Sequence, residues 1–163
     1  MKTLPTILAA FAALALSAHA ESTLKIEGVH NCCKKCTTGI ETAVAKVPGA
    51  KATIDKTTVT ITAGSEADAK KAGAELVAAG YYGKGLEAPA APDSAKVKSA
   101  TVENVHLCCP KCAKAANEAA KSVSGVTASN ATKGEKSFTV EGDFSKADLA
   151  AALEKNGFAA SIK

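Results

Sequence analysis

A short segment with three cysteines and one histidine occurs twice in this chain of 163 residues. The first copy spans residues 29–36 (VHNCCKKC), and the second spans residues 105–112 (VHLCCPKC). All six cysteines of the chain lie in these two copies. Thiolate and imidazole groups are ligands for soft and borderline metal ions, and neighbouring thiols can also exchange disulfides. The repeat therefore predicts a metal or thiol site that the chain builds twice.

Within each copy, a Cys-x-x-Cys pair is the primary candidate for metal binding. The pairs are Cys33/Cys36 and Cys109/Cys112. At a strand-to-helix turn, this spacing places one thiolate in the loop and the other in the first helical turn, so both can bind one ion. The positive end of the helix dipole favours thiolates, and nearby lysines add positive charge. These are Lys34, Lys35 and Lys111. The pattern favours metal binding over a plain disulfide.

One further cysteine and one histidine in each copy are candidate additional ligands. They are His30 and Cys32 in the first copy, and His106 and Cys108 in the second. Three sulfurs and one imidazole would suit a tetrahedral Zn(II) site. Adjacent side chains on an extended chain point in opposite directions, so Cys32 and Cys33 can both reach one ion only if the loop bends. The alternatives are a small buried cysteine beside the site and a histidine that hydrogen-bonds locally.

The first twenty residues have the features of a secretory signal peptide. Lys2 supplies a positive charge, residues 4–16 are apolar and rich in alanine, and residues 18–20 (AHA) form a small-x-small cleavage site. Cleavage after this site would start the mature chain at Glu21 and export it to the periplasm or the extracellular space. No later stretch is long and apolar enough to cross a bilayer, so no membrane span is expected after cleavage.

Export would expose the thiols to oxidation, and an even number of cysteines then usually forms structural disulfides. Each copy, however, has three cysteines. One thiol per copy must therefore stay free, bind metal or pair with the other copy. A disulfide between sequence neighbours such as Cys32 and Cys33 would also force a strained peptide geometry. Both observations weigh against a simple disulfide scaffold.

Composition excludes several other classes of protein. The formal net charge is +4, yet the chain has no arginine and only 4% aromatic residues. Because phosphate and base-edge contacts usually call on arginine, nucleic-acid binding is not expected. The only methionine is Met1, which rules out a Met-rich copper site. The sequence has no Ser/His/Asp set and no Gly-rich phosphate loop, so we do not expect an enzyme.

The repeat extends over most of the chain. An offset of 76 residues aligns His30 with His106, and an offset of 77 aligns residues 76–81 with residues 153–158. The segment between the copies is rich in proline and alanine, as in extended linkers. The sequence thus predicts a signal peptide at 1–20, a first domain at 21–87, a linker at 88–99 and a second domain at 100–163.

Hydrophobic spacing predicts the order strand, helix, strand, strand, helix, strand in each copy. In the first copy, strands are expected at residues 24–27, 52–55, 58–61 and 82–87. In the second, strands are expected at residues 101–105, 137–141 and 158–162. This βαββαβ order is the ferredoxin-like split. The expected fold class is therefore α+β, with two tandem ferredoxin-like domains, each a four-stranded antiparallel sheet with two helices on one face.

The expected helices follow from periodicity and capping residues. The first helix should bury Ile40, Ala43, Val44 and Val47, and the second should bury Ala67, Ala74, Leu76, Val77 and Ala78. Ser65 with Asp68, and Ser145 with Asp148, should cap the second helix of each copy. In the second copy, the first helix is expected at residues 113–123. It has Ala116 and Ala120 where the first copy has Ile40 and Val44, so the second domain should be the less stable one.

These motifs together resemble the heavy-metal-associated (HMA) domain family. The resemblance covers about residues 23–87 and 100–163. It is carried by Cys33-x-x-Cys36 followed by Val47-Pro48-Gly49, and by Cys109-x-x-Cys112 followed by Val123-Ser124-Gly125. The family includes the metal-binding modules of copper chaperones, of metal-transporting ATPases and of periplasmic mercury-binding proteins. Membership would imply the ferredoxin-like fold, with the two Cys-x-x-Cys pairs as primary ligands.

The chain departs from the family pattern just before each pair. The family usually has methionine two residues before the first motif cysteine, whereas this chain has Asn31 and Leu107. That methionine is usually a buried anchor of the loop. The additional cysteine and histidine of each copy are also not part of the family pattern.

We therefore expect an exported, non-enzymatic protein that binds a heavy-metal ion and acts as a scavenger, buffer or carrier. Cu(I) and Zn(II) are the first candidates, followed by Hg(II) and Cd(II). A metal transporter or a second metal-binding domain would be its partner. The alternatives are a thiol–disulfide exchange protein, in which the third cysteine resolves a mixed disulfide, and an HMA-fold interaction module whose cysteines do not bind metal.

Overall fold

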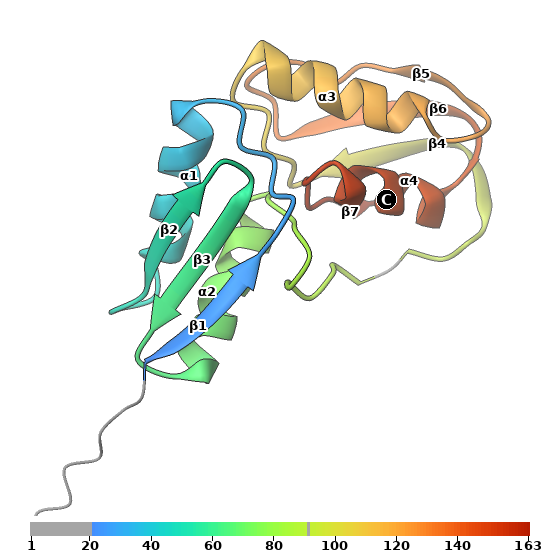
Figure 1. The fold of residues 1–163 in the computed structure, drawn as a ribbon. Helices are drawn as coiled ribbons and strands as arrows, with labels where there is room; N and C mark the ends of the chain where they lie inside the picture. The colour runs from blue at the N-terminus through green and yellow to red at the C-terminus, as the bar shows by residue number, and fades with distance from the viewer. Residues whose placement is uncertain (1–20, 91) are drawn as a thin grey trace, which may run out of the picture.

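The chain folds into two halves that lie side by side (Figure 1). The computed structural model describes residues 21–90 and 92–163. The predicted signal peptide at residues 1–20 lies outside the described residues. Four helices and two antiparallel sheets make up the halves, which confirms the α+β class. None of the helices in the described ranges is long and apolar enough to cross a membrane.

The first half contains three strands and two helices. They are β1 (Ser22–Ile26), α1 (Lys34–Val44), β2 (Lys51–Asp55), β3 (Thr58–Ala63) and α2 (Glu66–Ala78). The strand order in the sheet is β1-β3-β2, and both pairings are antiparallel. The hairpin turn between β2 and β3 uses Lys56 at a φ of 53°.

The fourth strand predicted at residues 82–87 does not form. Only isolated bridges occur there, including one between Glu27 and Lys84. Gly85 has a φ of 111°, which interrupts the extended conformation, and the Leu86 amide turns back to donate to the Gly83 carbonyl at 3.1 Å. The first sheet therefore has three strands rather than four.

The second half follows the predicted order of six elements. They are β4 (Lys96–Glu103), α3 (Pro110–Lys121), β5 (Val126–Ser129), β6 (Ser137–Ser145), α4 (Lys146–Lys155) and β7 (Ser161–Ile162). The strand order in this sheet is β5-β6-β4-β7. β4 begins at Lys96, inside the segment expected to be linker, because Lys96 and Val97 pair with Ser145 and Phe144 of the long strand β6.

Helix α2 buries a different face from the predicted one. Its buried residues are Ala69, Ala72, Gly73 and Leu76, whereas three of the predicted ones, Ala67, Ala74 and Ala78, are exposed. Alanine occurs on every side of this helix, so its positions indicate the buried face poorly. The cap was predicted correctly, since the Ser65 hydroxyl accepts from the Asp68 amide at 3.1 Å. Ser145 caps α4 in the same way, accepting from the Asp148 amide at 3.3 Å.

The first helix of each half is close to its prediction. Ile40, Ala43 and Val44 are buried in α1, and Val47 is buried just beyond its end. α3 begins at Pro110, three residues before the predicted start. Proline suits the first helical turn because no backbone donor is needed there.

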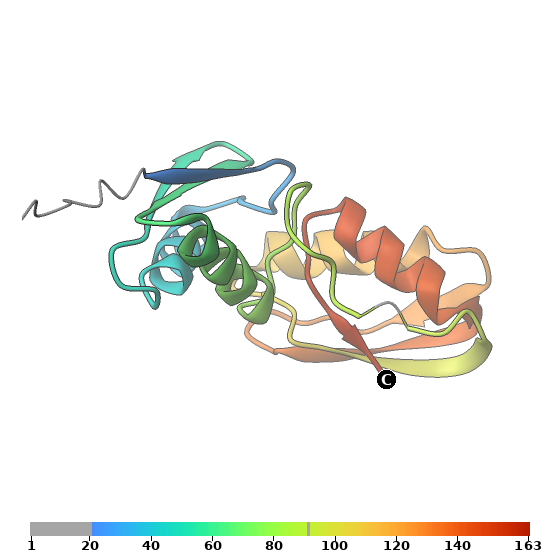
Figure 2. The ribbon, with the colours of Figure 1, turned by 90° about the horizontal axis from the view of Figure 1, so that it is seen from below.

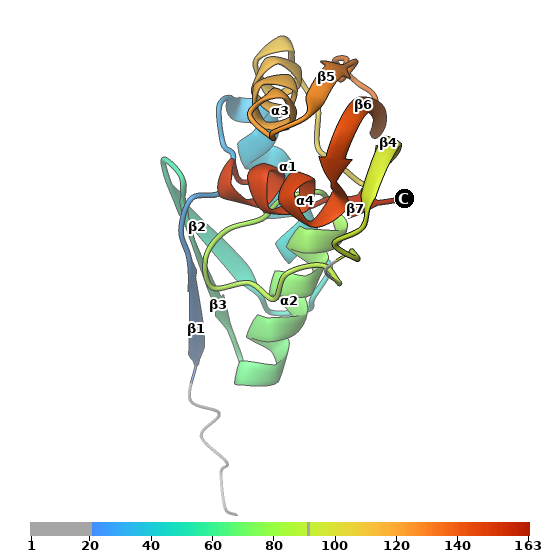
Figure 3. The same cartoon turned by 90° about the vertical axis from the view of Figure 1, so that its right-hand side faces the viewer.

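The two halves are oriented in opposite senses. In Figure 2 the sheet of the first half lies above its helices, whereas the sheet of the second half lies below its helices. Viewed from the side, the helices lie between the two sheets (Figure 3). The start of α1 and the start of α3 both lie at the junction of the halves (Figure 1), which brings the two cysteine loops together.

Candidate metal site

Each Cys-x-x-Cys pair lies at the N-terminus of a helix. Cys33 is the N-cap residue of α1, and Cys109 is the N-cap residue of α3. The second cysteine of each pair, Cys36 or Cys112, lies in the first helical turn and is fully buried. The Cys36 amide donates to the Cys33 carbonyl at 2.9 Å, which folds the loop back so that the Sγ atoms of this pair are 3.8 Å apart. In the second pair the Sγ–Sγ distance is 3.4 Å.

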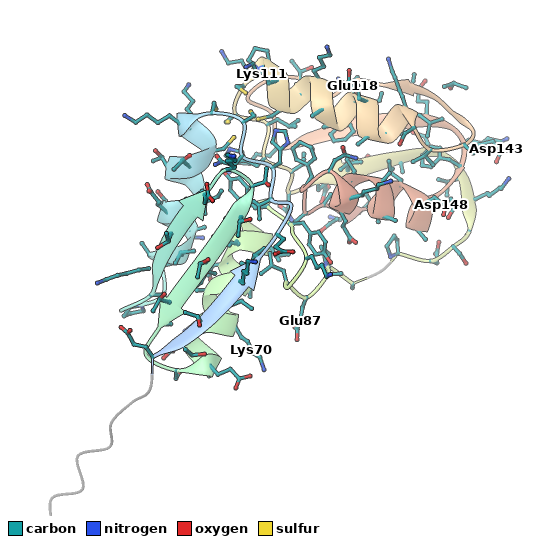
Figure 4. The ribbon with its side chains drawn as sticks, in the orientation of Figure 1. Lys70, Glu87, Lys111, Glu118, Asp143 and Asp148 are labelled. Atoms are coloured by element: carbon teal, nitrogen blue, oxygen red, sulfur yellow. The ribbon has the colours of Figure 1, made fainter. Side chains whose placement is uncertain are left out.

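The two cysteine loops contact each other across the junction of the halves. The Cys32 Sγ atom lies 3.5 Å from both the Cys109 and the Cys112 Sγ atoms. In the opposite direction, the Cys108 Sγ atom lies 3.5 Å from that of Cys36 and 3.9 Å from that of Cys33. Sulfur atoms gather between the starts of α1 and α3, close to Lys111 (Figure 4). All six thiols are free, and they form one array to which both halves contribute, rather than one separate cluster in each half.

The spacing of the sulfur atoms suits a bound metal ion. Nine Sγ–Sγ pairs are separated by 3.4–3.9 Å. With a metal–sulfur bond of about 2.3 Å, ligand sulfurs would lie about 3.8 Å apart in tetrahedral and about 4.0 Å apart in trigonal coordination. The thiols are therefore near coordination distance from one another, and small side-chain movements would suffice to bind an ion.

Both histidines lie beside this array, and each stacks on an aromatic ring of the other half. The His30 ring packs on Phe158, and the His106 ring packs on Tyr81, with ring centroids 4.4 Å apart in both cases. The Nε2 atoms of His30 and His106 are buried, and no hydrogen-bond partner for either is found among the described residues. A nitrogen of His30 lies within 4.8 Å of the sulfurs of Cys32 and Cys112. A buried imidazole nitrogen next to thiols is suited to bind a metal or to accept a hydrogen bond from a thiol.

Two glycines that end the second helices hold the halves together. Gly80 follows α2 and Gly157 follows α4, with φ angles of 88° and 81°. The Ala159 amide donates to the Gly80 carbonyl at 3.1 Å, and the Tyr82 amide donates to the Gly157 carbonyl at 3.0 Å. A Cβ atom on Gly80 would lie 2.6 Å from the Asn104 carbonyl oxygen. Glycine is therefore required for this close approach as well as for its backbone conformation.

The sequence-based prediction of the site did not include these contact residues. The sequence shows Gly80-Tyr81 and Gly157-Phe158 at equivalent places in the repeat, inside the segments that the offset of 77 residues aligns. The aromatic residue after each glycine was the available signal. Tyr81 is buried and its hydroxyl donates to the Cys36 carbonyl at 3.1 Å, so one side chain contacts the first cysteine loop and the histidine of the second.

The two loops are anchored by different chemistry at the position where the HMA family has methionine. Asn31 donates from Nδ2 to the Lys56 carbonyl at 2.8 Å and accepts from the Thr37 hydroxyl at 3.1 Å. Leu107 is instead buried in the core, and its carbonyl accepts from the Gly134 amide at 2.6 Å. Each anchor ties its cysteine loop to the β-hairpin turn of the same half.

The thiols differ in acidity. Burial acts to raise the pKa of Cys36, but the His106 imidazole, the Cys32 backbone and neighbouring thiols outweigh it and lower the pKa to about 5. Burial also opposes ionisation of Cys109, yet hydrogen bonds from the backbone and the thiol of Cys112 lower its pKa to about 7. One thiol of each half is therefore ready to bind a cation near neutral pH.

Three other thiols of the array and one histidine beside it have pKa values shifted in favour of their neutral forms. Burial, followed by hydrogen bonds to neighbouring thiols, raises the pKa of Cys32 and raises that of Cys108 to about 12. The pKa of Cys112 is raised for the same reasons. Burial is also the main cause of the lowered pKa of His30, which keeps its imidazole neutral, the form that binds metal.

The structure thus brings together every residue predicted as a ligand. They are Cys33, Cys36, Cys109, Cys112, Cys32, Cys108, His30 and His106. The repeat predicted two sites, one in each half, whereas the thiols of both halves are interleaved. This difference arises from the contact between the halves, which local sequence patterns do not describe.

Comparison with known proteins gives distant likenesses. No protein-family profile matches the chain, and no curated protein matches it. One similar solved structure is that of the N-terminal soluble domains of Bacillus subtilis CopA, with 18% identity, 89% of this chain and 95% of that chain covered, and a TM-score of 0.36. Another is the water-soluble region of the P-type ATPase CopA from Bacillus subtilis, with 18% identity, coverages of 89% and 93%, and a TM-score of 0.34.

Proposed function

We propose that this chain is an exported, non-enzymatic heavy-metal-binding protein with two HMA-like domains, acting as a scavenger, buffer or carrier. The observation that carries the proposal is the gathering of all six thiols, with two imidazoles beside them, at one junction between helix N-termini. Clustered thiolates select soft and borderline ions, with Cu(I) and Zn(II) first and Hg(II) or Cd(II) next. The primary ligands are the pairs Cys33/Cys36 and Cys109/Cys112.

The electrostatics of the junction support anionic ligands. The N-termini of α1 and α3 each carry the equivalent of about half a positive charge. Lys34, Lys35 and Lys111 lie in the first turns of these helices and are exposed. These charges would offset the thiolates of a loaded site, while Cys36 and Cys112 remain shielded from solvent. A carrier would pass its ion to a metal transporter or to another metal-binding domain.

Metal titration of residues 21–163 under reducing conditions tests the proposal. Purified protein is expected to bind Cu(I), Zn(II) or Hg(II) at one ion or more per chain, in competition with a chromophoric chelator. A variant with Cys33, Cys36, Cys109 and Cys112 replaced by alanine should lose this binding while keeping its far-ultraviolet circular dichroism. If the native sequence binds none of the three ions, the proposal is wrong. Insulin reductase activity without metal binding would favour thiol–disulfide exchange instead.

The proposed export has a separate test. Expression of the full chain in a bacterial host, followed by cell fractionation and mass spectrometry, should yield a mature protein that starts at Glu21 outside the cytoplasm. Full-length protein in the cytoplasmic fraction would contradict export without affecting the metal site.

A further inference from the structure

Each loop has one cysteine outside its Cys-x-x-Cys pair, and the sulfur of this third cysteine lies close to the pair of the other half. Cys32 is next to Cys33 in the chain, but its two shortest Sγ–Sγ distances, both 3.5 Å, are to Cys109 and Cys112. Cys108 likewise has its shortest distance, 3.5 Å, to Cys36 of the other half, while Cys112 of its own half lies at 3.7 Å and Cys33 at 3.9 Å. The contacts of Cys32 with the second half therefore correspond to the contacts of Cys108 with the first half.

Among the sets of three mutually close sulfurs, two consist of one complete Cys-x-x-Cys pair and the remaining cysteine of the other half, and we call these two sets the faces of the array. One face contains Cys109, Cys112 and Cys32, with Sγ–Sγ distances of 3.4, 3.5 and 3.5 Å. The other contains Cys33, Cys36 and Cys108, with distances of 3.8, 3.5 and 3.9 Å. Within each face, all three sulfurs are mutually close enough to bind one trigonal ion with metal–sulfur bonds of about 2.3 Å.

The local geometry explains why the third ligand comes from the other half. Cys33 and Cys109 have extended backbones, with φ and ψ of −162° and 167° and of −148° and 167°. Neighbouring side chains on an extended backbone point to opposite sides. Cys32 and Cys33 therefore leave the backbone on opposite sides, as do Cys108 and Cys109, although the two sulfurs of each neighbouring pair are still within 4.8 Å of each other.

We propose that the two halves exchange their third ligand, so that Cys32 completes a three-thiolate site with Cys109 and Cys112, and Cys108 completes one with Cys33 and Cys36. This inference rests on the proposed metal-binding function and specifies its ligand sets. Each site holds a soft ion such as Cu(I), for which three thiolates are suitable ligands. Each bound ion then links the two halves, and loading stabilises their junction.

The test isolates one face at a time. In a C33A/C36A parent, the face with Cys109, Cys112 and Cys32 stays complete and the other face keeps only Cys108, so Cu(I) X-ray absorption should count three sulfurs around one ion per chain. Adding C32A should reduce the count to two and weaken Cu(I) binding by about tenfold or more. Adding C108A instead should leave three sulfurs, since Cys108 belongs to the face that the parent has lost.

The mirror experiment uses a C109A/C112A parent, where the roles reverse and C108A should remove the third sulfur. It provides an independent sulfur count if one parent folds poorly, and far-ultraviolet circular dichroism would reveal such poor folding. A third sulfur supplied by Cys108 to Cys109 and Cys112 would overturn the exchange in favour of a ligand set within one half. Two sulfurs in both parents would also overturn it. Both of these results leave metal binding intact, whereas failure of the unmutated chain to bind Cu(I) contradicts the proposed function as well.

Discussion

The two halves carry similar cysteine loops at the starts of helices that bury side chains of different size. In the first half, α1 fills the core with Ile40 and Val44, whereas α3 has Ala116 and Ala120 at the equivalent positions. All four side chains are almost completely buried, so the second half gains much less apolar burial from its helix. It has a fourth strand, β7, that the first half lacks. Similar cysteine loops can therefore be supported by different combinations of helix packing and sheet.

The loops also divide the chemistry unequally. In the first half the acidic thiol is the buried Cys36, and in the second it is Cys109 at the N-cap. His106 lies beside Cys36 and contributes to its low pKa, which makes the acidity of the first loop dependent on the second half. The comparison suggests that the junction, rather than either half, sets the properties of the site.

The largest expected effect comes from making the first helix resemble the second. Ile40→Ala should destabilise the first half by about 2–5 kcal/mol, because it leaves a cavity under a fully buried side chain. Urea unfolding followed by tyrosine fluorescence reports this half, since Tyr81 and Tyr82 both lie there. In the native sequence, the second half should unfold first. Unfolding of the first half at lower urea in the unmutated chain would contradict the stability ranking.

A smaller effect is expected from separating the halves. Gly80→Ala should cost about 1–2 kcal/mol for the left-handed backbone conformation and, in addition, force the Asn104 backbone away. Gly49→Ala is the matched control, because Gly49 has a φ of 79° but nothing within 4 Å of its added Cβ. Hydrogen exchange should show loss of protection at the Tyr82 and Ala159 amides only in Gly80→Ala. Equal loss in both variants would mean that backbone strain alone is responsible.

The thiols of the metal-free, reduced protein should ionise in separate steps. Absorbance at 240 nm should rise near pH 5 for Cys36 and near pH 7 for Cys109, with Cys108 ionising only near pH 12. Cys36→Ser should remove the first step, and Cys109→Ser the second. A single step near the ordinary thiol pKa of about 8.5 would contradict the proposed difference between the loops.

The same pKa shifts predict a modest dependence of stability on pH. The lowered pKa of Cys36 contributes stability that is complete above the unfolded thiol pKa and is lost as the pH falls towards 5. The raised pKa of Cys108 contributes stability that is complete below the unfolded value and is lost as the pH rises towards 12. One contribution is lost at low pH and the other at high pH. Chemical unfolding at several pH values should therefore show a broad maximum in the free energy of unfolding between them. Cys36→Ser should flatten its acidic side.

The smallest effect is expected from replacing Tyr81 with phenylalanine, so that a phenylalanine ring stacks on each histidine. Tyr81→Phe removes the hydrogen bond to the Cys36 carbonyl but keeps a ring on His106, as Phe158 has on His30. The expected loss is about 1 kcal/mol, measured by thermal unfolding. Tyr82→Phe, at a half-buried neighbouring site, should change stability less. A larger loss in Tyr82→Phe would contradict this role of Tyr81.

Much of the fold could be predicted from local patterns. Capping by Ser65 and Ser145 follows from hydrogen bonds between near neighbours in sequence, which a short segment specifies by itself. The strand predicted at residues 82–87 was wrong because glycine weakens a strand: the segment contains Gly83 and Gly85, and Gly85 adopts a φ of 111°. The buried face of α2 was also mispredicted, since alanines occur all around that helix.

By itself, the sequence determined the identities and the spacing of the ligand candidates, because two Cys-x-x-Cys pairs at helix starts depend only on local chain geometry. It also indicated the α+β class through hydrophobic periodicity. The tertiary structure alone decided which thiols share a face. Cys32 and Cys109 are separated by 77 residues, and they meet because Gly80, Tyr81, Gly157 and Phe158 pack the halves in opposite orientations. That packing depends on surfaces formed only after each half has folded.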